Sequence, residues 1–89
     1  MMNYEIFKEV VAEKFMDYLP EEYKGMHLEV RPVEKVNQMM DGLTLTGDGV
    51  RISPTMYINN MYDHYLQTED LQEVLVSAAK TMDEAMKEA

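Results

Sequence analysis

The amino-acid sequence predicts an α+β domain in which two long helices cover one face of a three-stranded antiparallel sheet. Three observations lead to this fold class. Apolar residues recur with helical spacing near both ends of the chain, apolar and polar residues alternate between residues 26 and 52, and Gly47-Asp48-Gly49 interrupts that alternation. The expected order is helix, three strands, short helix and long helix. A chain of 89 residues allows one domain, 1–89, with one core.

The first helix is predicted to run from Asn3 to about Leu19. Asn3 suits the N-cap position, because its side chain can accept a hydrogen bond from the first turn. Pro20 ends the helix, since its ring removes a backbone donor and restricts the preceding residue. One side of the helix is apolar and is expected to face the core: Tyr4, Phe7, Val10, Val11, Phe15, Tyr18 and Leu19.

The first strand is predicted from Met26 to Val36. Alternation there places Met26, Leu28 and Val30 on the buried face of the sheet. Pro32 cannot donate a ladder hydrogen bond, which favours a strand that is either at an edge of the sheet or bulged near its middle. A loop is expected to follow at residues 37–41.

A hairpin is predicted around Gly47-Asp48-Gly49, because glycine supplies the positive φ that such a turn requires. Its inward-facing residues are expected to be Leu43, Leu45, Val50 and Ile52. The outer face of the sheet is then expected to be polar, with these residues projecting together: His27, Glu29, Arg31, Thr44, Thr46, Arg51 and Ser53.

Two helices are predicted after the sheet. Residues 55–58 can extend the last strand, and Asn59 or Asn60 is expected to cap a short helix through Tyr65. Thr68 is expected to cap the long final helix. That helix has no glycine or proline to end it, and this lack of a stop signal favours a native chain that continues past Ala89. The apolar stripe of that helix comprises Leu71, Val74, Leu75, Ala78, Ala79, Met82 and Met86.

Composition excludes several classes of protein. A net charge of −9 argues against direct binding to nucleic acid or to an anionic membrane surface, since both depend on clustered Lys and Arg. The chain has no apolar run long enough to span a bilayer and no signal-peptide pattern, so a cytoplasmic location is expected. With no cysteine, it has neither disulfides nor thiolate metal sites.

Three short motifs of the chain resemble motifs of a known protein family. They are Val33-x-Lys35-x-Asn37, Asp41-Gly42-Leu43 and Pro54-Thr55-x-Tyr57-x-Asn59. At similar separations they resemble the N-terminal region of an uncharacterised family of proteins from gut Clostridia and related Firmicutes. The resemblance covers essentially the whole chain. It implies a bacterial cytosolic origin and a longer native protein, and it implies no activity.

No catalytic, cofactor-binding or metal-ligating residues are identified, and no cofactor is expected. His27 and His64 are the chain's two imidazoles, and neither belongs to an HExxH-like spacing that would point to a metal. The aspartates beside glycines do not follow the calcium-loop pattern, and the glycines lack the ending of a phosphate loop. Turn chemistry explains both groups.

A possible interaction surface is predicted instead. Its aromatic part comprises Tyr57, Asn59, Tyr62, His64 and Tyr65, residue types that provide contact area with hydrogen-bonding tips. The alternative is that the tyrosines close one end of the core. Flexible side chains near the same loops, Met39 and Met40, suit either an adaptable binding surface or an irregular core. Arg31 and Arg51 add a less acidic sheet face, which suits a small anionic ligand or another copy of the chain.

The function favoured by the sequence is a non-enzymatic protein-interaction domain, or a structural domain of a longer bacterial protein, with a protein partner or a homo-oligomer. The alternative is an acidic inhibitor that mimics nucleic acid, because both long helices are acidic on their outer sides. A small enzyme without a recognisable motif is the third hypothesis. Mimicry predicts salt-sensitive binding of a partner, whereas an enzyme predicts a concave pocket with convergent polar groups.

Overall fold

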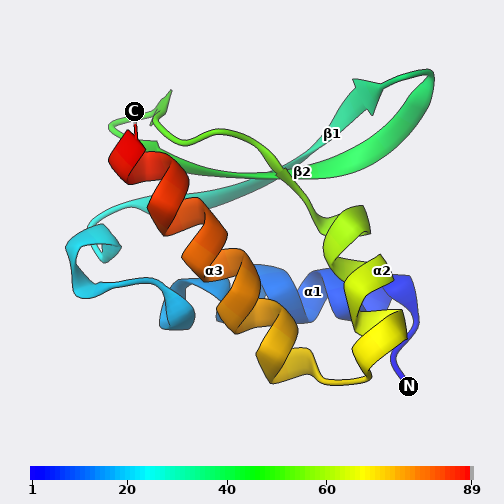
Figure 1. The fold of residues 1–89 in the computed structure, drawn as a ribbon. Coiled ribbons are helices and arrows are strands. Elements are labelled where there is room, and N and C mark those ends of the chain that lie inside the picture. Colours follow the sequence, from blue (N-terminus) through cyan, green and yellow to red (C-terminus); the bar gives the residue numbers. More distant parts are fainter. Residues whose placement is uncertain (89) are drawn as a thin grey trace.

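A computed structural model describes residues 1–88 and has the predicted α+β architecture (Figure 1). The helices are α1 (Tyr4–Lys14), α2 (Ile58–Thr68) and α3 (Leu71–Glu88), and two short 3-10 turns follow α1, at Phe15–Tyr18 and Glu21–Tyr23. The antiparallel strands are β1 (His27–Lys35), β2 (Gln38–Gly47), β3 (Val50–Arg51) and β4 (Met56–Tyr57).

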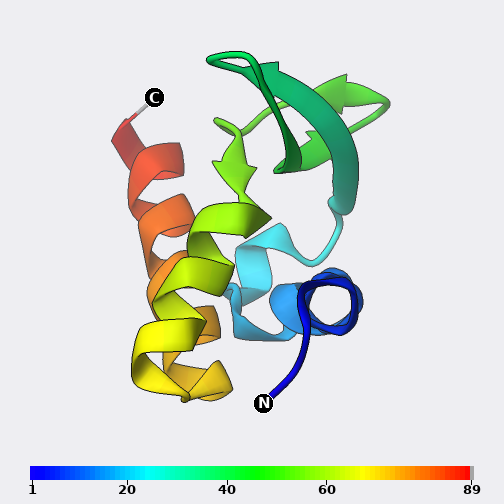
Figure 2. The same ribbon diagram turned by 90° about the vertical axis from the view of Figure 1, so that its right-hand side faces the viewer.

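The three helices lie on one side of the sheet, as Figures 1 and 2 show from two directions. β2 is the central strand. It pairs with β1 along one edge and with both β3 and β4 along the other. The predicted third strand is therefore present as two short pieces, and the predicted extension at residues 55–58 is confirmed in part as β4.

The loop predicted at residues 37–41 is wrong. β2 already begins at Gln38, which pairs with Lys35, so Val36 and Asn37 alone connect the strands. Both residues have positive φ, 49° and 61°. Such two-residue turns match the strand twist and usually contain Asn and Gly. Because Val rarely adopts positive φ, the sequence carries no recognisable signal for this turn.

β1 is an edge strand, the first of the two alternatives that Pro32 predicted. In a two-residue hairpin the pair beside the turn exchanges hydrogen bonds, and bonded and non-bonded pairs then alternate. Counting from Lys35 and Gln38, the Pro32–Asp41 pair is non-bonded, so the Pro32 nitrogen faces away from β2. At this position a missing N–H costs no hydrogen bond within the sheet.

Two side chains complete the other edge of β2 where the neighbouring backbone departs from it. The Ser53 hydroxyl accepts a hydrogen bond from the Leu45 backbone nitrogen at 2.8 Å. The Asn59 side-chain oxygen does the same for the Asp41 nitrogen, also at 2.8 Å. Because these oxygens replace backbone carbonyls, β2 remains satisfied on both sides of the short strand β4.

Replacing Ser53 by alanine is expected to lower the free energy of unfolding by about 1–3 kcal/mol, since it leaves the buried Leu45 N–H without an acceptor. Chemical denaturation of the two proteins measures the difference. Ser77→Ala is the matched control, because Ser77 is exposed on α3. An equal effect of both substitutions would contradict the role assigned to Ser53.

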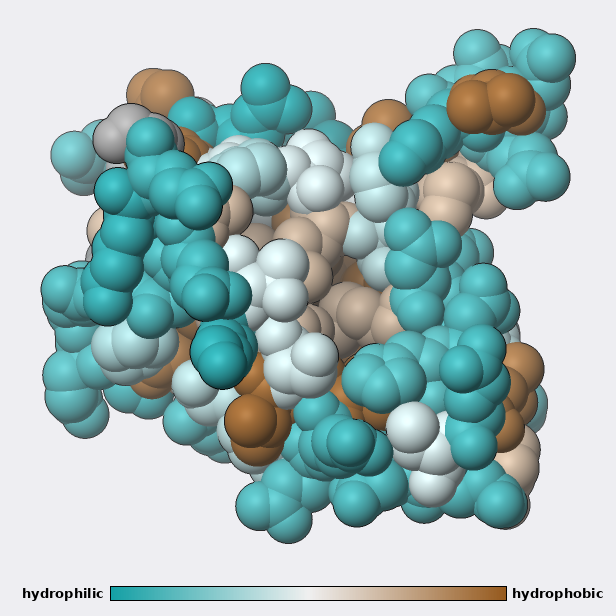
Figure 3. Space-filling view, in the orientation of Figure 1, coloured by the Kyte–Doolittle hydropathy of each residue, from teal (hydrophilic) through white to brown (hydrophobic). Residues whose placement is uncertain are grey.

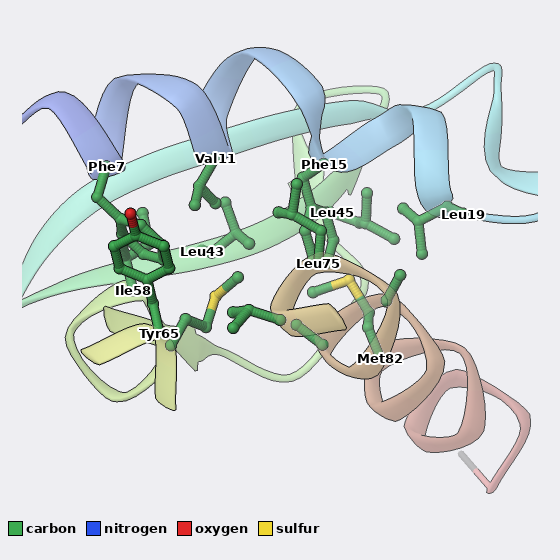
Figure 4. Packing of buried hydrophobic residues seen from close by; sticks show 14 of the residues in the cluster. Phe7, Val11, Phe15, Leu19, Leu43, Leu45, Ile58, Tyr65, Leu75 and Met82 are labelled. Carbon is green, nitrogen blue, oxygen red and sulfur yellow. The ribbon is translucent and has the colours of Figure 1, made fainter. Parts of the chain in front are cut away.

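The core lies between the sheet and the helices (Figure 4). The predicted face of the first helix is confirmed, because Phe7, Val11 and Phe15 are fully buried and Leu19 is 4 % exposed. β2 contributes Leu43 and Leu45, and the remaining buried apolar residues come mostly from α2 and α3: Ile58, Met61, Tyr65, Val74, Leu75, Ala78, Ala79 and Met82.

The inward placement predicted for Val50 and Ile52 is wrong, since they are 62 % and 38 % exposed. Val50 pairs with Gly47 and by register shares the face of Leu43 and Leu45, but the core does not extend to this end of the sheet. Conversely, Thr44 and Thr46, predicted on an open outer face, are only 5 % and 9 % exposed. Both threonines line a hollow of the sheet, whose strands are strongly curved in Figure 2, and strand alternation alone does not predict such curvature.

The predicted helix caps are confirmed in one case out of three. Asn3 accepts a hydrogen bond from the Ile6 nitrogen, as expected. Neither Asn59 nor Asn60 caps α2, which starts at Ile58, because the Asn59 side chain bonds to β2. Asp70 caps α3 by accepting from the Glu73 nitrogen, whereas Thr68 is the last residue of a longer α2.

Tyr23 connects the segment after α1 to α3. Its hydroxyl donates a hydrogen bond to Asp83 at 2.7 Å, which raises the pKa of Tyr23 to about 12 and lowers the pKa of Asp83. The contribution of Asp83 to stability is therefore lost as the pH falls, and that of Tyr23 is lost as the pH rises above 10. The link between these segments is present across the neutral range.

Candidate functional site

A groove opens between α2, α3 and β4, with a volume of about 420 Å³. Figure 3 shows a hollow between these two helices, with pale and light brown atoms in it and hydrophilic residues around it. We call it the α2–α3 groove, and its lining residues are Lys35, Thr55, Met56, Tyr57, Asn60, Met61, His64, Val74, Ser77, Ala78 and Thr81.

The groove has an apolar floor and a polar rim. Met61, Val74 and Ala78 are buried and belong to the core. Ser77 and Thr81 lie one turn apart on α3 and are exposed, while Asn60 and His64 lie one turn apart on α2. An apolar floor with a few polar groups at its border is the usual composition of a binding site.

Among the described residues, 1–88, no Asp or Glu lines the α2–α3 groove, although the chain contains 17 of these residues. Lys35 lies at its edge, with its ammonium nitrogen 4.1 Å from the centre of the Tyr57 ring. This cation–π contact orients the lysine without neutralising its charge. The groove therefore suits a neutral or negatively charged occupant.

A second hollow, of about 340 Å³, lies on the outer side of the curled sheet. We call it the concave sheet face. Thr55 belongs to both hollows, which therefore adjoin across the segment leading into β4. The concave sheet face is lined by Glu29, Arg31, Val33, Gly42, Thr44, Thr46, Gly49, Arg51 and Thr55.

The structure divides the predicted interaction surface between separate places. Tyr57 and His64 line the α2–α3 groove, and Arg31 and Arg51 line the concave sheet face. The outer-face grouping predicted from strand alternation is thus largely present in the concave sheet face. Two of the seven predicted residues are exceptions, since Ser53 is buried against β2 and His27 does not line the hollow.

Tyr62 and Tyr65 lie on α2 and pack against α1. Their rings are 5.1 Å and 5.3 Å from the Phe7 ring, centre to centre. The Tyr62 hydroxyl donates to the Met2 carbonyl, and the Tyr65 hydroxyl accepts from the Met2 nitrogen. For these two tyrosines the structure agrees with the alternative in which aromatic residues close one end of the core.

Met39 and Met40 lie on the β1–β2 hairpin, away from the lining of either hollow. Met39 is 64 % exposed, and Val36 in the adjoining turn is 85 % exposed. The tip of this hairpin projects from the body of the molecule in Figures 1 and 3. Met39 and Met40 therefore do not line the groove that Tyr57 and His64 border.

Several lining residues were not predicted from the sequence. Ser77 and Thr81 are spaced by four residues beside the apolar stripe of α3, a pattern that is equally typical of a solvated helix side. Lys35 comes from β1, more than twenty residues from Tyr57 in the chain. The surroundings of these side chains depend on how elements distant in the chain pack together. The spacing of residues along the sequence does not reveal that packing.

The three sequence motifs meet at the boundary between the two hollows. Asp41 is held by Asn59, and Lys35 stacks on Tyr57. A β-carbon on Gly42 would lie 2.8 Å from a methyl group of Thr55 and 2.9 Å from one of Val33. The Thr55 and Val33 side chains therefore pack against Gly42 in the space that a larger residue would need. One function of the motif residues is therefore structural, since they position Thr55 and Tyr57.

Among residues 1–88, no three Asp, Glu or His side chains converge in a way that could hold a metal ion. Within the same range, no helix combines the length and apolar character that crossing a membrane requires.

A family of unknown function (DUF5688) matches residues 4–89, almost the entire chain. The chain belongs to this family. No curated protein and no solved structure matches the chain. Because the DUF5688 family is one of unknown function, the two hollows are the features of this domain that bear on what it does.

Proposed function

We propose that this DUF5688 domain is a non-enzymatic protein-interaction domain that holds a segment of a partner protein in the α2–α3 groove. The observation that carries the proposal is the combination of a buried apolar floor, a polar rim and, among residues 1–88, a lining without carboxylates in a strongly acidic chain. Apolar floors receive apolar side chains, and polar borders fix the orientation of the ligand.

The partner segment is expected to carry an apolar side chain followed by an acidic group. The apolar side chain would contact Met61, Val74 and Ala78, which form the floor. The acidic group would face Lys35, whose charge no carboxylate of residues 1–88 neutralises. Asn60 and Ser77, on opposite sides of the groove, supply hydrogen-bonding groups for the partner backbone.

The experiment is affinity purification of the tagged protein from its host, with quantitative mass spectrometry of retained proteins at low and moderate salt. Ser77→Trp fills the groove from its rim, and Val76→Trp places the same bulk on an exposed neighbouring residue that does not line it. A partner retained by the wild type and by Val76→Trp, but reduced about tenfold or more by Ser77→Trp, supports the proposal.

Other results would contradict it. Equal retention by both tryptophan variants would place the contact elsewhere, and an empty eluate at both salt concentrations would argue against a stable protein partner. A nucleic-acid-binding protein retained at low salt alone, and lost on replacing Glu5, Glu9 and Glu13, would favour the acidic mimic. These three carboxylates form an exposed row on α1, spaced by about 6 Å along the helix axis.

We further infer that the protein acts in the cytosol of a bacterium related to gut Clostridia. This inference rests on the resemblance of the Val33, Asp41 and Pro54 motifs to proteins of that group. Fluorescence microscopy of the tagged protein in its host would test it, and a signal confined to the cell envelope would contradict it.

A further inference from the structure

The concave sheet face contains both arginines of the chain. Arg31 comes from β1 and Arg51 from β3, twenty positions apart in a sequence with 8 basic and 17 acidic residues. Arg31 on β1 pairs with Gly42 of β2, and Arg51 on β3 pairs with Thr46 of β2. This register places both arginines on the outer side of the sheet. Arginine is the side chain best suited to carboxylate and phosphate groups, because its planar fork donates two parallel hydrogen bonds.

Thr44 adds a polar group that is almost enclosed by the protein. It lies on β2 between the two arginine positions and is 5 % exposed, yet its hydroxyl forms no hydrogen bond with residues 1–88. No side-chain oxygen or nitrogen in this range is both sealed from solvent and unpaired. The Thr44 hydroxyl therefore opens into the hollow, where a ligand can accept its hydrogen bond.

The charges of the hollow leave one arginine available. Arg31 forms an ion pair with Glu29, at 2.7 Å between Nη2 and Oε1. Arg51 has no ion-pair partner among residues 1–88. Among residues 1–88, Glu29 is the one carboxylate that lines the hollow, so the described lining residues have a net charge of +1 in a protein whose overall charge is −9.

We propose that the concave sheet face is a binding site for an oxyanion, the carboxylate or phosphate group of a small ligand. Arg51 and Arg31 supply the positive charge, and the Thr44 hydroxyl supplies a further donor. Glu29 orients the Arg31 guanidinium and weakens the binding of a second negative charge. This site is separate from the α2–α3 groove, so either proposal can fail without the other.

Nuclear magnetic resonance tests the proposal directly, because two arginines give two side-chain Nε–Hε signals. The labelled protein is titrated with inorganic phosphate, acetate and chloride at matched ionic strength. Saturable shifts of both arginine signals and of the Thr44 amide with phosphate or acetate are expected. Saturable shifts with phosphate alone would identify a phosphate ligand, and saturable shifts with acetate alone would identify a carboxylate ligand. Small shifts that follow ionic strength equally for all three salts would overturn the proposal.

Variants assign the effect to the named residues. Arg51→Gln is expected to weaken binding of the active anion by about tenfold, and Glu29→Gln to strengthen it about two- to fivefold. Lys80→Gln is the matched control, since it removes the same charge from an exposed position on α3 outside the hollow. Equal weakening by Arg51→Gln and Lys80→Gln would show a general charge effect and contradict the site. The dispersed amide spectrum of each variant confirms its fold.

Discussion

Phe15→Ala is expected to lower the free energy of unfolding by about 3–5 kcal/mol. Phe15 is fully buried at the point where α1 becomes a 3-10 turn, and it lies against the core formed by β2 and α3 (Figure 4). Removal of its ring loses apolar burial and leaves a cavity. Because domains have total stabilities of about 5–15 kcal/mol, the loss would bring this one close to unfolding.

Denaturant titration followed by circular dichroism measures this change. Ile6→Ala is the control on the same helix, because Ile6 is 48 % exposed, and it is expected to cost less than about 1 kcal/mol. A loss below about 1 kcal/mol for Phe15→Ala as well would mean that the first helix contacts the sheet through a different side.

Gly42→Ala is expected to lower the free energy of unfolding by about 1–3 kcal/mol, although alanine normally stabilises a strand relative to glycine. Its β-carbon would lie 2.8 Å from the Thr55 methyl group and 2.9 Å from a Val33 methyl group. Both neighbours are β-branched and stiff, so neither can rotate away without strain. The substitution is therefore expected to displace β4 from β2, with effects on both hollows.

Two further measurements isolate this cause. Gly25→Ala serves as the control, because its β-carbon would meet no atom within 4 Å, and it is expected to be neutral or slightly stabilising. In a background with Val33→Ala and Thr55→Ser the crowding methyl groups are absent, so Gly42→Ala is expected to lose most of its penalty. An unchanged penalty in that background would rule out this steric explanation.

The hairpin between β1 and β2 shows where prediction from the sequence fails. Alternation from Met26 onward correctly indicates a strand, and Pro32 correctly indicates an edge as one of two alternatives. The turn was missed because Val36 occupies a positive-φ position that usually carries Asn or Gly. Asp48 and Gly49 adopt the same backbone conformation at the second turn, and there the sequence signal was correct.

The polar side chains Ser53 and Asn59 show a second kind of failure. A serine before proline and an asparagine near a helix start both read as local turn or cap residues. In the structure each one bonds to the backbone of β2 instead, 8 and 18 residues away in the chain. Propensity concerns local partners, so it does not predict a hydrogen bond to a distant strand that the fold brings close.

The sequence by itself determined the α+β class, the order of the elements, the buried side of the first helix and the membership in a family of unknown function. These features depend on periodicity and on local motifs, which are properties of neighbouring residues. The tertiary structure alone decided that Tyr57 and His64 border a groove, that Tyr62 and Tyr65 support the core, and that Arg31 and Arg51 share one hollow. The physical reason is that sheet curl and helix packing bring together residues far apart in the chain, and spacing along the sequence carries no information about those distances.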